Sequence, residues 1–396
     1  MRQFNRKNIL EILGGNISKL IVFQVIEKIF PLLSLWLVSI LYDINILDNF
    51  GFAIISVSTV IAWSTSGIGV ATTKTAVGKK HKEMDSLYSL SGLFSVLTIL
   101  VFIVINVISN NFSLHQHIVI IFSGYLASIS VLKKSYYIAL YKWRVLYIAF
   151  TVSLVGSLLT IIFLSLFEIN FPELGIFVFY FLLSLLLKAN FYPKLKYNKS
   201  VVEYFMNELG PLYFTGIISG SVVFVLTLIA DSQEDKTGIT TLIAIGFQII
   251  TILQFIPMAL NRVLFITIAS GEKIKSKLAI MRLLVFTILV AIPFYITIPF
   301  LGSNYAKLSS FTFVLLVLCS IGSTYSTFFG NILVAKGKTK QWTLITFIGT
   351  IIGISVIFFP FHIKLVDLVF MTATFIYFIQ FILGIIYNEK YRILHI

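Results

Sequence analysis

Charged residues are scarce in this chain. Only 12% of its 396 residues are Asp, Glu, Lys or Arg, whereas 58% are hydrophobic. A water-soluble domain covers its surface with about 25% charged residues. The deficit excludes a soluble globular protein and indicates that most of the surface faces lipid. About twelve helices of roughly 20 apolar-rich residues each would account for this length.

Cysteine and metal-ligand clusters are also lacking. Cys319 is the one cysteine, so no intramolecular disulfide can form. His115 and His117 lie close together, but no Cys or acidic residue accompanies them at metal-ligand spacing. The chain contains no glycine-rich phosphate-binding loop of the nucleotide-hydrolase kind. We therefore expect no enzymatic activity, no metal, no cofactor and no ATP hydrolysis by this chain.

Hydropathy and helix breakers predict twelve membrane spans joined by short connections. The expected fold class is an all-α polytopic membrane protein. The spans run over residues 17–41, 51–72, 88–108, 117–138, 146–167, 174–192, 211–230, 239–263, 282–301, 310–335, 343–361 and 366–387.

The 30 basic residues are distributed unevenly over the connections. The N-terminus and every second segment after it hold 22 of them, and the alternate loops hold 3. By the positive-inside rule, this asymmetry places both termini in the cytoplasm. The basic residues are spread over seven cytoplasmic segments, so we expect no nucleic-acid partner. The alternate loops hold acids, which we interpret as residues of short solvated turns: Asp43, Asp48, Glu168, Glu173, Asp231, Glu234, Asp235 and Asp367.

The two halves of the chain show signs of an internal repeat. Residues 76–82 and 269–275 both read Ala-x-Gly-x-Lys-x-Lys, at an offset of 193. Six spans per half is an even number, so the repeats should be parallel, related by an axis along the membrane normal. The expected architecture is two six-helix bundles, residues 1–200 and 201–396, that flank a central cavity and rock to expose it to alternate sides. Pro31 and Pro257 interrupt predicted spans and are candidate hinges.

Ionisable residues within the spans are candidate site residues because burial in lipid is costly for them. Gln24, Glu27, Lys28 and Pro31 follow helical spacing, and this face should point into the bundle. Glu27 is interpreted as an ion-pair partner of Lys28 or Arg262, or as a proton site.

The predicted spans and their inner ends contain more cations than anions, which favours an anionic substrate such as a phosphate or diphosphate. Besides Lys28, the candidates are Lys133, Lys134 and Arg262. For the last three residues, snorkelling towards lipid phosphates remains an alternative.

Four short motifs resemble those of a known family. They are residues 46–51 (Ile-Leu-Asp-Asn-Phe-Gly), 67–71 with Lys74, 256–260 with the following Val263-Leu264-Phe265, and 330–338. The pattern is similar to O-antigen and polysaccharide flippases of the multidrug/oligosaccharidyl-lipid/polysaccharide exporter superfamily. The chain departs from it at three points: the first Gly and the Glu of the first motif are missing, and Ile266 replaces a Pro.

The resemblance implies movement of an undecaprenyl-diphosphate-linked oligosaccharide from the inner to the outer leaflet of a bacterial inner membrane. It implies a cationic cavity reached through a lateral gate between spans one and eight, with Lys28 and Arg262 as its cations and Lys133 and Lys134 as further ones. The implied partners are this lipid-linked substrate, membrane lipids and polysaccharide polymerase or ligase machinery.

Three other classes remain open. A cation-coupled multidrug or small-solute antiporter of the same superfamily is favoured by Glu27. A major-facilitator sugar carrier shares the layout of six plus six spans, but Thr72-Thr73-Lys74 lacks the Asp-Arg of that family. A non-transporting scaffold for polysaccharide assembly is the third.

Overall fold

The computed structural model describes residues 6–65, 96–104, 114–188, 209–231, 238–261, 276–297, 307–358 and 363–390, with residues 90 and 93. Every regular element in these ranges is a helix. In the first half these are α1 (Arg6–Leu41), α2 (Ile44–Thr65), α5 (Leu114–Ala139), α6 (Trp143–Leu166) and α7 (Leu174–Leu186). In the second half they are α9 (Gly210–Asp231), α10 (Ile239–Leu253), α12 (Ser276–Thr297), α14 (Ser310–Ala335), α15 (Thr339–Ile354), the 3-10 helix η3 (Ser355–Phe358) and α16 (Leu365–Lys390).

Eight of the described helices are long and apolar enough to cross a membrane, and a bent pair, Ile239–Leu253 with Phe255–Asn261, makes a ninth. Two shorter apolar helices, Leu174–Leu186 and Leu283–Thr297, fall where spans six and nine are predicted. The third predicted span, 88–108, lies partly outside the described residues. A helix satisfies its own backbone hydrogen bonds, which is why it is the element that lipid tolerates.

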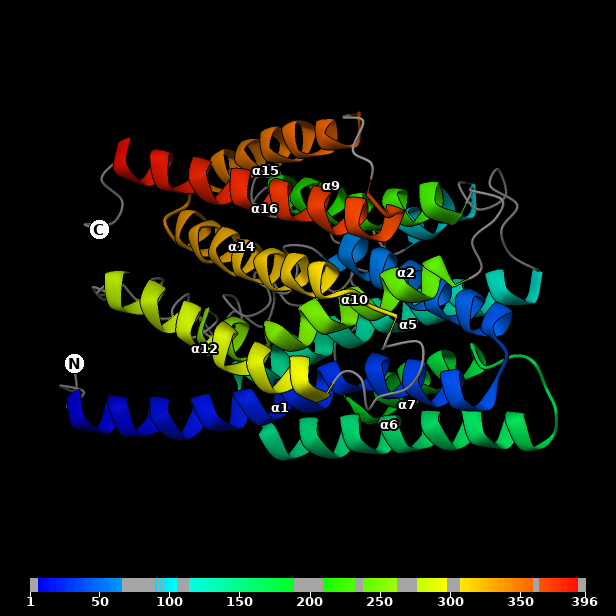
Figure 1. The fold of residues 1–396 in the computed structure, drawn as a ribbon. Helices are drawn as coiled ribbons and strands as arrows, with labels where there is room; N and C mark the ends of the chain where they lie inside the picture. The colour runs from blue at the N-terminus through cyan, green and yellow to red at the C-terminus, as the bar shows by residue number, and fades with distance from the viewer. Residues whose placement is uncertain are drawn as a thin grey trace.

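The helices run side by side, and both termini lie at the same end of the bundle (Figure 1). We call this the proximal end and the opposite one the distal end. Along the bundle α1 packs against α6, α7 against α5 and α6, and α16 against α14 and α15. The two halves meet where α2 packs against α9 and α10, and where α1 packs against α10. Spans one and eight, the pair implied as a lateral gate, are therefore in contact.

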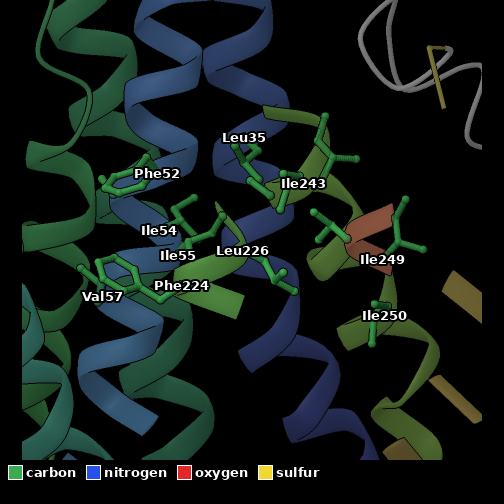
Figure 2. Packing of buried hydrophobic residues seen from close by; sticks show 14 of the residues in the cluster. Leu35, Phe52, Ile54, Ile55, Val57, Phe224, Leu226, Ile243, Ile249 and Ile250 are labelled. Atoms are coloured by element: carbon green, nitrogen blue, oxygen red, sulfur yellow. The ribbon is translucent and has the colours of Figure 1, made fainter. Parts of the chain in front are cut away.

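The largest apolar cluster lies at this junction between the halves. Leu35 of α1, Phe52 of α2, Phe224 of α9 and Ile243 of α10 are all almost completely buried in it (Figure 2). Helix α10 also meets α16 closely, because Gly246 has no side chain. A Cβ atom there would lie 2.1 Å from Cζ of Phe370.

Helix α6 shows which surface faces lipid. Ile148, Val152, Val155 and Leu159 follow helical spacing and are each 44–59% exposed. An exposed apolar stripe of this kind has no place in water but suits a hydrocarbon environment.

The predicted eighth span is broken in the structure. Helix α10 ends at Leu253, and the helix Phe255–Asn261 follows at an angle of 50°. Pro257 explains the break: its ring clashes with the carbonyl group four residues earlier, and it has no N–H to donate to that group. This carbonyl belongs to Leu253, the last residue of α10. The bend lies where the sequence predicts a hinge, whereas α1 continues through Pro31.

Candidate functional site

A cavity of about 230 Å³ lies beside the break in span eight. Helix α2 of the first half forms one wall, and α9, α10, α14 and α16 of the second half form the others. We call it the α10 cavity. Its lining residues are Ile55, Ser58, Thr59, Ala62, Gly220, Val223, Phe247, Gln248, Ile250, Thr251, Gln254, Cys319, Ser323 and Tyr377.

The lining of the α10 cavity combines apolar surface with uncharged polar groups. Its hydrogen-bonding groups are mainly hydroxyls and carboxamides, and no Lys, Arg, Asp or Glu is among the described residues that line it. The Nε2 atom of Gln254 is buried and has no hydrogen-bond partner among the described residues. None of the described residues that line this cavity is one of the cations expected from the sequence.

Glu27 forms an ion pair within the first half of the chain. Lys134 Nζ of α5 donates to Glu27 Oε1 of α1 at 2.5 Å, and both side chains are mostly buried, with 9% and 16% exposed. The sequence predicts Lys28 or Arg262 as an ion-pair partner of Glu27. In the described part of the chain, Glu27 pairs with Lys134, a residue 107 positions further along the chain. Gln24, one turn before Glu27, is buried as predicted for this face, and its Oε1 has no partner among the described residues.

Three of the four predicted substrate-binding cations lie in the described part of the chain, and their contacts differ. Lys134 is neutralised by Glu27. Lys133 Nζ donates to the Ser184 carbonyl of α7 at 2.8 Å. Lys28 is half-buried and makes no ion pair with any described residue. Arg262 lies outside the described residues.

Asp48 forms hydrogen bonds between the two halves at the distal end, a role that was not predicted from the sequence. Its carboxylate lies on α2 and accepts hydrogen bonds from the backbone N–H of Gly238 at 2.6 Å and of Thr241 at 2.9 Å, and also from the Thr241 hydroxyl. These are unpaired N–H groups at the start of α10, so Asp48 caps a helix of the other half. A carboxylate there also interacts favourably with the positive end of the helix dipole.

The interpretation of the distal acids as solvated turn residues is therefore wrong for Asp48. It is also wrong for Glu173, which is 1% exposed, and for Asp367, which is 5% exposed and accepts a hydrogen bond from the Thr312 hydroxyl at 2.5 Å. Asp43 and Glu168 are exposed, as expected.

No family model matches the sequence, and no curated protein matches it. Solved structures do match. The eukaryotic MATE transporter AtDTX14 aligns with a TM-score of 0.69 at 13% identity, over 96% of this chain and 99% of that one. A multidrug resistance MATE family transporter of the MOP superfamily, in an inward-facing conformation, aligns with a TM-score of 0.62 at 9% identity, over 94% of both chains.

A third neighbour is a MOP superfamily transporter from Pyrococcus furiosus, with a TM-score of 0.63 at 10% identity, over 96% of this chain and 95% of that one. The chain has the fold of the MATE transporters. This confirms the predicted class, an all-helical bundle of two repeats with twelve helices. The neighbours named here are MOP superfamily members, and none supports the polysaccharide-flippase branch. Identities of 9–13% establish the fold alone.

Proposed function

We propose that this chain is a membrane transporter that carries a small uncharged solute through the α10 cavity by alternating access. The observation that carries the proposal is the position of this cavity together with its lining. It lies between helices of both halves, at a break in a span, and presents uncharged hydrogen-bonding groups. The MATE-like fold supports the same class of function.

The uncharged lining selects for an uncharged ligand. A buried ion needs a compensating charge, and its desolvation is costly without one. The described walls of the α10 cavity offer none, but Gln248, Gln254 and Thr251 offer donors and acceptors, and Phe247 and Ile250 offer apolar area. A solute that combines hydrogen-bonding groups with a compact apolar body fits these walls.

The volume points to a small solute. Pockets for drug-sized ligands measure about 300–1,000 Å³, and the α10 cavity, at about 230 Å³, lies just below that range. A lipid-linked oligosaccharide is far larger. A small-solute antiporter therefore agrees better with this geometry than a flippase does.

In the proposed transport cycle, the hydrogen bonds of Asp48 keep the distal end of the bundle closed in the state described by this structure. They join α2 to the start of α10 at the distal end, which the distribution of basic residues assigns to the outside. Opening the cavity to the outside requires these bonds to break. The predicted hinge at Pro257 lies at the other end of α10, next to the cavity.

Glu27 is the candidate coupling residue. It is an acid in a predicted membrane span and is neutralised by Lys134. Protonation of Glu27 would free Lys134, so the binding of a proton or another cation would change how α1 and α5 interact. This coupling is part of the proposal.

A flippase for a lipid-linked diphosphate remains the second candidate, and Lys28 favours it. Lys28 is half-buried in a span and has no ion pair among the described residues. If Lys28→Ala and Arg262→Ala variants both restore surface polysaccharide in a strain that lacks its flippase, the diphosphate assignment of these two residues is excluded.

The test of the main proposal compares two probes of similar size in inverted membrane vesicles: an uncharged aminocoumarin and the cationic N-methylquinolinium. We expect the wild-type protein to transport the aminocoumarin and to discriminate against the cation. Gln254→Leu should lower transport of the aminocoumarin about tenfold, the effect of losing one good hydrogen bond to the solute.

Gln341→Leu is the matched control, because Gln341 lies at the start of α15 and not in the α10 cavity. Equal transport by the wild type and Gln254→Leu, or a preference for the cation, would exclude the α10 cavity as a site for uncharged solutes.

A further inference from the structure

Glu173 is a buried acid with an incomplete set of hydrogen bonds. It lies at the distal end, directly before α7, and is 1% exposed. Its Oε1 accepts a hydrogen bond from Gln116 Nε2 of α5 at 2.9 Å. Its Oε2 has no hydrogen-bond partner among the described residues. Only neutral donors, the Glu173 backbone N–H and the Gln116 amide, approach the two buried oxygens, so an ionised carboxylate is poorly satisfied.

The neighbouring Tyr42 does not supply the missing donor. Its hydroxyl has a single proton, which points towards the carbonyls of Ile161 at 3.2 Å and Ile169 at 3.5 Å. Burial, followed by the nearby charge of Glu173, raises the pKa of Tyr42. Tyr42 therefore stays protonated and gives Glu173 no hydrogen bond that would stabilise a negative charge.

No cation among the described residues balances Glu173. It makes no ion pair with any of them. Helix α6 has no ionisable side chain in its distal half, and Tyr125 and Tyr180 lie deeper on α5 and α7. The other ionisable residues at the distal end of the first half are Asp43 and Asp48 near the start of α2, His115 and His117 on α5, and Glu168 in the turn before α7.

The protonation state follows from this environment. Burial raises the pKa of the Glu173 carboxyl, while its hydrogen bonds, including the one from Gln116, act more weakly in the opposite direction. In the neutral acid Oε1 still accepts the hydrogen bond from Gln116, and a neutral O–H at Oε2 is less costly to bury than a negative charge.

We propose that Glu173 is a proton-binding site at the distal end of the bundle. Its carboxyl holds a proton while α5, α6 and α7 are packed as in this structure. When that end opens and water enters, the O–H bond breaks, the proton passes to water and the negative charge stays on the carboxylate. This site is separate from Glu27 and from the α10 cavity, and the inference does not depend on either.

The first test is thermal unfolding of the purified full-length protein as a function of pH. A pKa raised by folding gives stability that is complete below the ordinary pKa of Glu and is lost as the pH rises through the raised value. The wild type should therefore lose a few degrees in Tm over this interval. Glu173→Gln, which mimics the protonated acid, should lack this loss. Glu168→Gln should keep it, because Glu168 is exposed in the same turn.

A second variant separates a proton site from a merely structural residue. Gln116→Leu removes the donor that favours the ionised form, so the midpoint of the pH dependence should shift to higher pH. This comparison needs only the wild type and Gln116→Leu, and it remains decisive if Glu173→Gln does not fold. The proposal is overturned if the Glu173→Gln profile follows that of the wild type, or if the Gln116→Leu midpoint stays in place or moves to lower pH.

Discussion

The interiors of the two halves are stabilised by different chemistry. In the first half, α1 and α5 carry Glu27, Lys28, Lys133 and Lys134, and a buried ion pair joins the two helices. In the second half, α10 and α14 carry no charged residue along their whole lengths. Their polar groups are carboxamides and hydroxyls, several of which face the α10 cavity.

This difference indicates that the two halves have different functions. A buried ion pair tolerates little change, because either charge is costly once its partner is removed. Neutral groups such as the Gln254 amide cost less when unpaired and can exchange partners with a solute. The first half is therefore suited to respond to ions, and the second half to bind an uncharged solute.

The largest effect is expected at the ion pair. Lys134→Met leaves the mostly buried Glu27 carboxylate without its cation, and loss of one partner of a buried pair costs about 3–5 kcal/mol. The free energy of unfolding, measured by denaturant titration in detergent, should fall by that amount.

The double variant Glu27→Gln/Lys134→Met is the control. It removes both charges and should regain most of the lost stability. A single variant as stable as the wild type would show that the pair is solvated, and the contrast between the halves would lose its basis.

The sequence shows that ionisable residues lie within the spans of the first half, but it does not show which of them pair with one another. Helical spacing correctly placed Gln24 on a buried face, and the hydrophobic composition predicted the class of fold. The partner of Glu27, however, lies on another helix, and no local pattern links positions 27 and 134. For the same reason, the contacts of Lys133 with Ser184 and of Lys134 with Glu27 could not be predicted from the sequence.

A packing variant tests whether the stability of the second half depends on close packing, whereas that of the first half depends on an ion pair. Gly246→Ala places a methyl group against the Phe370 ring, at a site where a Cβ would lie 2.1 Å from Cζ. Overpacking of this kind costs about 1–3 kcal/mol. Thermal unfolding should show the loss, and Gly246→Ala/Phe370→Leu should reverse part of it. If the single variant is fully stable, α10 and α16 can separate freely at this point.

Asp48 connects the two halves, and its loss should have a smaller effect. Asp48→Ala removes a helix cap, which costs about 0.5–2 kcal/mol. Because the cap joins α2 to α10, the variant should also open the distal end more often. A cysteine introduced at Thr240, in a Cys319→Ser background, should then react faster with a membrane-impermeant thiol reagent. Asp43→Ala, at an exposed acid nearby, should change neither quantity. Unchanged labelling in Asp48→Ala would show that these hydrogen bonds do not hold the halves closed.

The roles of the distal acids could not be predicted from the sequence. Hydropathy identifies the ends of spans, and an acid at such an end is usually solvated. Asp48 and Glu173 differ from Asp43 and Glu168 only in what packs over them, namely the start of α10 in one case and Gln116 of α5 in the other. The broken span eight was more accessible to prediction, because Pro257 is visible in the sequence and acts on a residue four positions earlier.

The smallest effect on stability is expected at Gln254, and it sharpens the contrast with Lys134. The Gln254 side chain has a buried amide nitrogen without a partner among the described residues, so its removal should break no strong bond that supports the fold. Replacing such a group by an apolar side chain of similar size is close to neutral, so Gln254→Leu should change the free energy of unfolding by less than about 1 kcal/mol. The same variant should lose about tenfold in transport of the uncharged probe. Gln254→Leu would thus lower transport while leaving the stability of the second half nearly unchanged. A loss at Gln254 as large as that at Lys134 would instead show that both interiors depend on their polar groups for folding.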